Sequence, residues 1–172
     1  VLFMTNQNYF SSLAEPNVWY WNLFGKVIRT YLSLIPKKVL VPDFAPPHTI
    51  SGYNFRIAEK EKDRYVFIGP ILDPSIHDFA PSEEIVFASF GGEPFKMPLY
   101  AMLKEISEQD TALDVHVFAT SPGLPEEGKN FKIAGYVESI FPYMASAKTA
   151  IIHGGLTSLH EALYFGKPVL LI

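Results

Sequence analysis

The segment that most constrains the fold of this chain is 149–172, which reads TAIIHGGLTSLHEALYFGKPVLLI. Its apolar start is typical of a buried parallel strand. A histidine and two glycines follow at 153–155, and the apolar residues after them recur at helical spacing. Gly166 suits the position just past a helix, and residues 169–172 predict the next strand. The segment therefore predicts a βαβ unit whose first loop can hold an anion, because backbone N–H groups and the positive end of the helix dipole converge there.

The alternation of strand and helix patterns extends back to residue 85. Short apolar runs predict strands at 85–89, 115–119, 132–136, 150–152 and 169–172. Helical periodicity lies between them, with Pro98 and Pro142 in the first turns of two expected helices. Strands that alternate with helices indicate an α/β fold with a parallel sheet and right-handed crossovers.

Residues 1–80 are less regular. Their candidate elements are strands at 1–4, 38–41 and 65–68 and an amphipathic helix at 17–35. Prolines then recur between 69 and 82 with no helical or strand period, which is typical of a linker. The sequence thus predicts two domains, 1–80 and 81–172. Because the chain starts and stops inside apolar runs, we also expect it to be an internal piece of a longer protein.

Charge and composition argue against several classes of function. Residues 1–80 carry 8 basic and 7 acidic side chains, whereas 81–172 carry 6 and 11, and an acidic half is a poor nucleic-acid surface. We therefore expect no nucleic-acid partner, and we expect backbone dipoles rather than lysines to hold any phosphate. The absence of cysteine and of an apolar run near ~20 residues is compatible with a cytoplasmic protein. The spacing of the five histidines does not predict a metal site, and dinucleotide, P-loop and serine-hydrolase motifs are lacking.

Two glycine pairs, Gly91-Gly92 and Gly154-Gly155, each follow a predicted strand. Because the carboxyl ends of parallel strands meet at one edge of a sheet, two turns without side chains could approach one ligand there. Thr157 and Ser158, at the expected helix start, could offer hydroxyl and N–H donors to phosphate oxygens, and His153 could add a third contact. This pattern favours a diphosphate site.

The same helix start has a structural interpretation that needs no ligand. Ser158 and Glu161 have the S-x-x-E spacing of a capping box, in which the glutamate bonds back to its own helix. Such caps are much commoner than binding sites. Spacing alone leaves both interpretations open.

The segment resembles the donor-binding signature of nucleotide-sugar glycosyltransferases with the two-domain GT-B fold. It is similar to the H-C-G-W-N-S-x-x-E…G-x-P core of the UDP-glycosyltransferases, with a likeness to UDP-GlcNAc transferases. The matching positions are His153, Gly155, Ser158, Glu161, Gly166 and Pro168, and Thr157 stands where that core has asparagine. Residues 89–92 resemble the S-F-G turn that opens the same domain, and 134–137 resemble the segment that holds the base.

The resemblance implies a parallel Rossmann-like sheet of the GT-B type. It implies an incomplete, nucleotide-sugar donor domain in 81–172 and the end of an acceptor-binding domain in 1–80. The implied reaction is a hexosyltransferase reaction, in which a sugar passes from a nucleoside diphosphate sugar, with UDP expected, to an acceptor hydroxyl, without a metal or other cofactor. The catalytic base is expected outside this chain, so we expect no catalytic residue within it and no turnover by this piece alone.

The resemblance also assigns donor-binding roles to individual residues. His153 and the start of the helix would bind the diphosphate, and Glu161 would bind the ribose hydroxyls. The glycine turns would let the backbone approach the phosphates, and the residues after the third strand would flank the base. The full expected set is Ser89, Gly91, Gly92, Tyr136, Val137, His153, Gly154, Gly155, Thr157, Ser158 and Glu161.

Two other functions remain open from the sequence. One is a non-catalytic nucleotide-sugar-binding subunit that needs a partner chain, and the other is a sugar-nucleotide 2-epimerase of the same fold. The basic, aromatic helix expected at 17–35 motivates a lipid-linked acceptor and a peripheral contact with the inner membrane surface. Such a helix can equally pack against its own domain.

Overall fold

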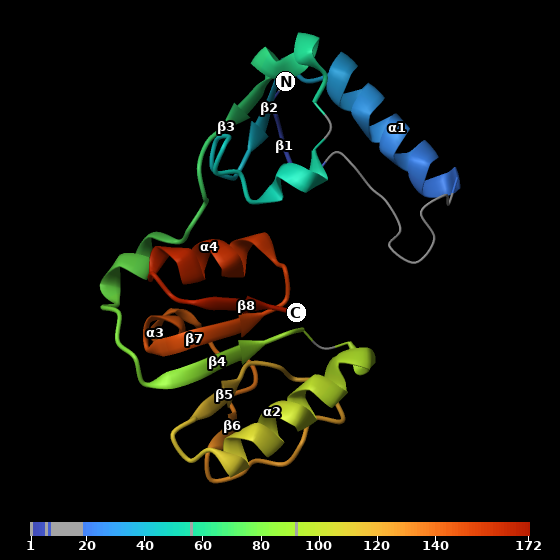
Figure 1. Cartoon of the computed structure of the whole chain (residues 1–172). Coiled ribbons are helices and arrows are strands. Elements are labelled where there is room, and N and C mark those ends of the chain that lie inside the picture. The colour runs from blue at the N-terminus through green and yellow to red at the C-terminus, as the bar shows by residue number, and fades with distance from the viewer. Residues whose placement is uncertain (1, 6, 8–18, 56, 92) are drawn as a thin grey trace. The chain divides into compact units, whose positions relative to one another are not determined.

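The computed structural model describes residues 2–5, 7, 19–55, 57–91 and 93–172 (Figure 1). The chain divides into two compact units, Val1–Ile71 and Leu72–Ile172. The division falls inside the proline-rich segment that the sequence marks as a linker, but before residue 80. Asp73 caps a short 3-10 helix at Pro74–Asp78, whose Ile76 is buried in the core of the second unit.

The first unit is built on a three-stranded parallel sheet. Its strands are β1 (Leu2–Met4), β2 (Lys38–Val41) and β3 (Tyr65–Phe67), in the order β1-β2-β3. Val39 and Val41 of the central strand are fully buried, as the apolar run predicts. Two further 3-10 helices, Ser51–Asn54 and Glu59–Arg64, connect β2 to β3.

Helix α1 (Trp19–Leu34) follows β1 in the first unit. Its buried side is narrow: Gly25 and Leu32 are buried, and Ile28 is partly buried between them. Most of the aromatic and aliphatic stripe that the sequence assigns to the packed face is exposed among the described residues, with Val27 at 55%. No helix in the described part of the chain has both the length and the apolar character needed to cross a bilayer.

The second unit contains a five-stranded, wholly parallel sheet. Its strands are β4 (Ile85–Ser89), β5 (Val115–Val117), β6 (Phe131–Ile133), β7 (Ala147–Ile152) and β8 (Val169–Leu171). They lie in the order β6-β5-β4-β7-β8. Every strand that the sequence predicts after residue 84 is present, which confirms the α/β class and the parallel sheet.

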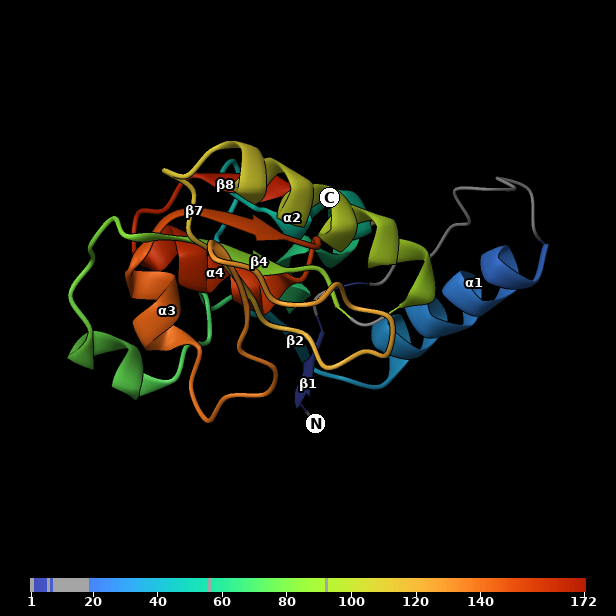
Figure 2. The same ribbon diagram turned by 90° about the horizontal axis from the view of Figure 1, so that it is seen from below.

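Helices cover both faces of this sheet (Figure 2). Helix α2 (Met97–Gln109) packs on one face, where Tyr100 stacks on Phe90 with ring centroids 4.4 Å apart. Helices α3 (Phe141–Ala145) and α4 (Leu156–Tyr164) pack on the other, around Phe87 and Phe118. A strand-helix alternation with helices on both faces is the doubly wound arrangement, in which strands are buried on both sides.

The end of α4 is built as the sequence predicts. Gly166 has φ +65°, a conformation that a residue with a Cβ adopts only at a cost. Its N–H donates to Leu163 O at 3.0 Å, and the N–H of Lys167 donates to Ala162 O at 2.9 Å. These two bonds are those of a Schellman motif, which satisfies the last carbonyls of the helix.

Candidate functional site

The order of the strands places two predicted turns side by side. From β4 the chain runs outward through β5 and β6, and then returns to β7 on the other flank of β4. Ser89 at the end of β4 is the register partner of Ile152 at the end of β7. The turns that follow these two residues therefore meet where the strand order reverses. In open α/β sheets this switch point, at the carboxyl ends of the strands, is where ligands bind.

His153 connects the two turns. Its backbone N–H donates to Ser89 O at 3.2 Å, and its ring Nδ1 lies 3.4 Å from the same oxygen. The N–H of Gly155 turns back to His153 O at 2.6 Å. A Cβ on Gly155 would lie 3.1 Å from His153 Nε2, so the absence of a side chain there leaves room for the ring. The structure thus brings Ser89, His153 and Gly155 together as expected from their places in the sequence.

Helix α4 begins directly after this turn. Gly155 is its N-cap, with no capping side chain, and Thr157 is exposed while Ser158 is partly exposed in the first turn. The capping-box interpretation is wrong, because Ser158 is the third residue of the helix and not its cap. The first N–H groups of a helix have no partner within it, so they can donate to a ligand.

Glu161 lies one turn further along α4 and is only 8% exposed. Its Oε2 has no hydrogen-bond partner among the described residues. Burial raises the pKa of this carboxyl to about 7 from a reference value of 4.5. Buried polar atoms in proteins are normally hydrogen-bonded, so this unpaired carboxyl oxygen fits a group that accepts bonds from ligand hydroxyls.

The turn after β4 is held by two residues that the sequence did not single out. Gly91 has φ +84°, as a tight glycine turn requires. The hydroxyl of Tyr100 accepts from Phe90 N at 2.9 Å and donates to Gly91 O at 3.1 Å. The ammonium of Lys96 donates to Phe90 O at 2.5 Å. In the sequence, both residues follow the glycine pair within ten positions. That spacing does not show that their side chains reach back to the turn, because their direction depends on how α2 packs. Gly92 lies outside the described residues.

The residues expected to flank the base are not joined to these turns. Tyr136 and Val137 follow β6, and both β5 and β4 lie between that strand and β7. Tyr136 is 89% exposed, whereas Val137 packs on the core of the second unit. Both follow the carboxyl end of a strand of the same sheet, and their expected role stays a prediction. Gly154 is exposed, and a Cβ added there would meet no atom within 4 Å.

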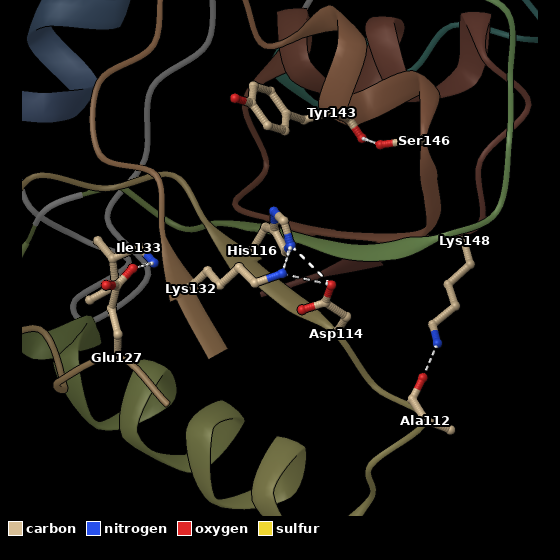
Figure 3. Close-up of polar contacts among 9 residues, drawn as sticks. All are labelled: Ala112, Asp114, His116, Glu127, Lys132, Ile133, Tyr143, Ser146 and Lys148. Carbon is tan, nitrogen blue, oxygen red and sulfur yellow. Dashed lines mark hydrogen bonds and ion pairs between the residues drawn. The ribbon is translucent and has the colours of Figure 1, made fainter. Parts of the chain in front are cut away.

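A second polar cluster lies on β5 and β6 (Figure 3). Asp114 Oδ2 lies 3.0 Å from Lys132 Nζ and 3.2 Å from His116 Nε2. Burial opposes the ionised form of Asp114, but hydrogen bonds from Lys132 and His116 lower its pKa overall. Asp114 precedes β5 and so lies toward the amino ends of the strands, away from the glycine turns. In the described part of the chain, histidine and acidic side chains form no group of three or more that could hold a metal ion.

Comparisons with known proteins find glycosyltransferases. Residues 109–172 match the model of the glycosyltransferase family 28 C-terminal domain. An uncharacterized glycosyltransferase of Methanosarcina acetivorans is 27% identical over 159 residues, which cover 86% of this chain and 42% of that protein. One of Methanosarcina mazei is 24% identical over 156 residues, covering 86% and 41%. The chain thus spans about two fifths of the length of these relatives.

The fold is also that of a solved glycosyltransferase. The glycotransferase of kitacinnamycin aligns with a TM-score of 0.60 and 19% identity over 86% of this chain and 38% of that one. The sheet, the switch-point turns and the structural likeness show the GT-B fold that the sequence predicted. The chain is thus similar to glycosyltransferases of this fold, and the family match covers residues 109–172.

Proposed function

We propose that the protein containing this chain transfers a sugar from a nucleoside diphosphate sugar, with UDP as the nucleotide, to an acceptor hydroxyl. The second unit would bind the donor, and the first unit would belong to the acceptor-binding domain. The observation that carries the proposal is the meeting of the Gly91 and His153 turns at the switch point of the parallel sheet. Family likeness supports glycosyl transfer as the type of reaction.

The diphosphate, the ribose and the base of the donor would each have a matching group along the carboxyl edge of this sheet. The N–H groups at the start of α4 and the ring of His153 would donate to the diphosphate. As the bond to the sugar breaks, negative charge develops on the diphosphate, and these fixed donors would stabilise it. Glu161 would accept bonds from the ribose hydroxyls through its unpaired oxygen. Tyr136 and Val137 would flank the base.

Calorimetry on the natural protein tests this proposal. UDP should bind more tightly than UMP, since the second phosphate adds bonds to the α4 start, and TDP tests whether the site prefers uracil. His153→Ala should weaken UDP binding, whereas His48→Ala, at an exposed position of the first unit, should not. Glu161→Gln should weaken binding of UDP, and Glu105→Gln, on the exposed side of α2, serves as its control. Failure of the natural protein to bind any nucleotide would refute the proposal.

The reaction itself is tested by product analysis. Incubation with UDP-GlcNAc and an acceptor should release UDP with transfer of the sugar. Formation of the epimeric sugar nucleotide would identify an epimerase, and binding without any product would identify a non-catalytic subunit. Neither alternative is favoured by a contact in the described residues.

The acceptor is the part of the proposal that rests on α1. This helix exposes Trp19, Leu23 and Val27 beside Lys26, a combination that suits an anionic lipid surface. We therefore propose a lipid-linked acceptor, reached from the inner face of the membrane. Sedimentation of the natural protein with vesicles that contain anionic lipid should show binding, and Trp19→Ser with Val27→Ser should reduce it. Equal sedimentation of the protein with and without vesicles would contradict the proposed membrane contact and, with it, the lipid-linked acceptor.

A further inference from the structure

The turn after β4 carries an ion pair that the expected donor site does not use. Lys96 ends the 3-10 helix Pro94–Lys96, and its side chain is only 13% exposed. Its ammonium reaches back to Phe90 O at 2.5 Å, at the carboxyl end of β4. Glu93 Oε2 lies 3.0 Å from the same ammonium. A positive charge is therefore fixed at the switch point.

The carboxylate of Glu93 fills the space beside the glycine. A Cβ placed on Gly91 would lie only 2.8 Å from Glu93 Oε2, so this oxygen lies against the bare side of the turn. The hydrogen bond with Lys96 lowers the pKa of Glu93, and the charge of His153 acts in the same direction with a smaller effect. An anion thus already lies against the β4 turn.

We propose that Lys96 is a further donor-binding residue and that Glu93 is an internal anion that competes with the donor's diphosphate for it. This inference rests on the proposed function. A phosphate oxygen beside Gly91 would meet the same ammonium that now binds Glu93, and the two anions cannot share one place without repulsion. The Glu93 side chain is about half exposed, so its carboxylate can turn into water and leave the Lys96 ammonium to the phosphate.

Other lysines of the second unit are engaged elsewhere. Lys104 pairs with Glu108 on α2, Lys132 with Asp114, and Lys167 donates to Ser82 O. Lys96 alone among these four donates to the β4 turn. Tyr100 fixes that turn through Phe90 N and Gly91 O, so the ammonium and the backbone have a defined relative position. A preorganised cation of this kind stabilises a leaving diphosphate more than a mobile surface lysine does.

Titration of the natural protein with UDP and with uridine tests the proposal. Lys96→Gln should weaken UDP binding at least about tenfold and leave uridine binding within about twofold, because the lost bond is charge-assisted and made only to phosphate. Glu93→Gln should strengthen UDP binding by about two- to fivefold, as a competing charge is removed. In a protein that already carries Lys96→Gln, adding Glu93→Gln should not strengthen UDP binding, because the cation for which Glu93 competes is gone.

The control pair lies on α2, the helix that follows Lys96. Lys104→Gln and Glu108→Gln make the same changes of net charge at a partly exposed ion pair away from the β4 turn and should leave UDP binding within about twofold. Equal losses for Lys96→Gln and Lys104→Gln, or weaker UDP binding by Glu93→Gln, would overturn the inference. If Glu161→Gln and His153→Ala weaken UDP binding while Lys96→Gln does not, this inference fails and the proposed function survives. Absence of nucleotide binding by the natural protein would refute both.

Discussion

Glu161 is a buried carboxyl whose ionisation opposes folding. Its pKa is raised by burial to about 7 in the folded chain from 4.5. At a pH between the two pKa values, the folded chain keeps a proton on Glu161 that the unfolded chain has lost. The contribution of this carboxyl to the free energy of unfolding is therefore fully present below pH 4.5 and is lost as the pH rises through about 7. We expect the free energy of unfolding of the second unit to fall by about 2 kcal/mol from pH 5 to pH 8 on this account.

Urea unfolding of the natural protein and of Glu161→Gln across this range isolates the effect. The difference between the two cancels contributions from other titrating groups that both share. The variant should lack this decline and be the more stable of the two at pH 8. Parallel stability curves for both proteins would show that the Glu161 carboxyl does not ionise in this range.

Two glycines of the same segment should respond differently to alanine. Gly166 has φ +65°, so Gly166→Ala should cost about 1 kcal/mol of stability and leave nucleotide affinity unchanged. Gly155 has an ordinary φ of −71°, but its Cβ would lie 3.1 Å from His153 Nε2. Gly155→Ala should therefore displace the ring and weaken UDP binding with little loss of stability. Thermal unfolding and calorimetry on both variants measure the contrast, and the reverse pattern would contradict it.

At the scale of elements, the loop after β2 is organised by one buried side chain. Asp43 is fully buried, and its two oxygens accept from the N–H groups of Phe44, Ile50 and Ser51 and from the Ser51 hydroxyl, at 2.6–3.3 Å. Burial alone would raise the pKa of this carboxyl, but the hydrogen bonds lower it overall. These bonds tie the proline-rich stretch that follows β2 to the residues that begin the next 3-10 helix.

Asp43→Asn should destabilise the first unit by about 2–3 kcal/mol, because an amide N–H₂ would face the N–H and hydroxyl of Ser51 in place of an acceptor. Hydrogen exchange of the peptides that carry β2 and β3 should quicken. Asp63→Asn, at an exposed position of the same unit, is the matched control and should have little effect. Equal exchange in the two variants would contradict the assigned role of Asp43.

Helix periodicity located the helices but not their buried sides. In α2 the residues at helical spacing are Leu99, Met102, Leu103 and Ile106. Leu99 and Leu103 pack on the core as that spacing predicts. Met102 and Ile106 are exposed, however, and Tyr100 is buried. In α4, Leu163 is exposed while His160 and Glu161 are buried. A face rich in apolar residues is only a statistical guide, because the buried side is set by which strands and loops lie against the helix. Tyr100 and Lys96 were missed for this reason.

At the scale of the whole molecule, the two units should respond differently to the donor. A ligand that binds only the folded second unit stabilises it by about 2.7 kcal/mol at one hundred times its Kd. Hydrogen exchange with saturating UDP should slow in peptides that carry β4, β7 and the start of α4. Peptides of β2 and β3 serve as the internal reference. Protection confined to the first unit would place the nucleotide in the wrong domain and contradict the assignment.

The sequence by itself determined the local pieces of this protein: the parallel strands, the glycine turns, the α4 start and its Schellman end. These depend on residues close together in the chain, where periodicity and backbone preferences leave a readable pattern. Only the tertiary structure decided that β4 and β7 are neighbours, that Glu161 is buried without a partner, and that Lys96 reaches the β4 turn. Strand order and burial arise from contacts between residues far apart in the sequence, and no local pattern specifies them.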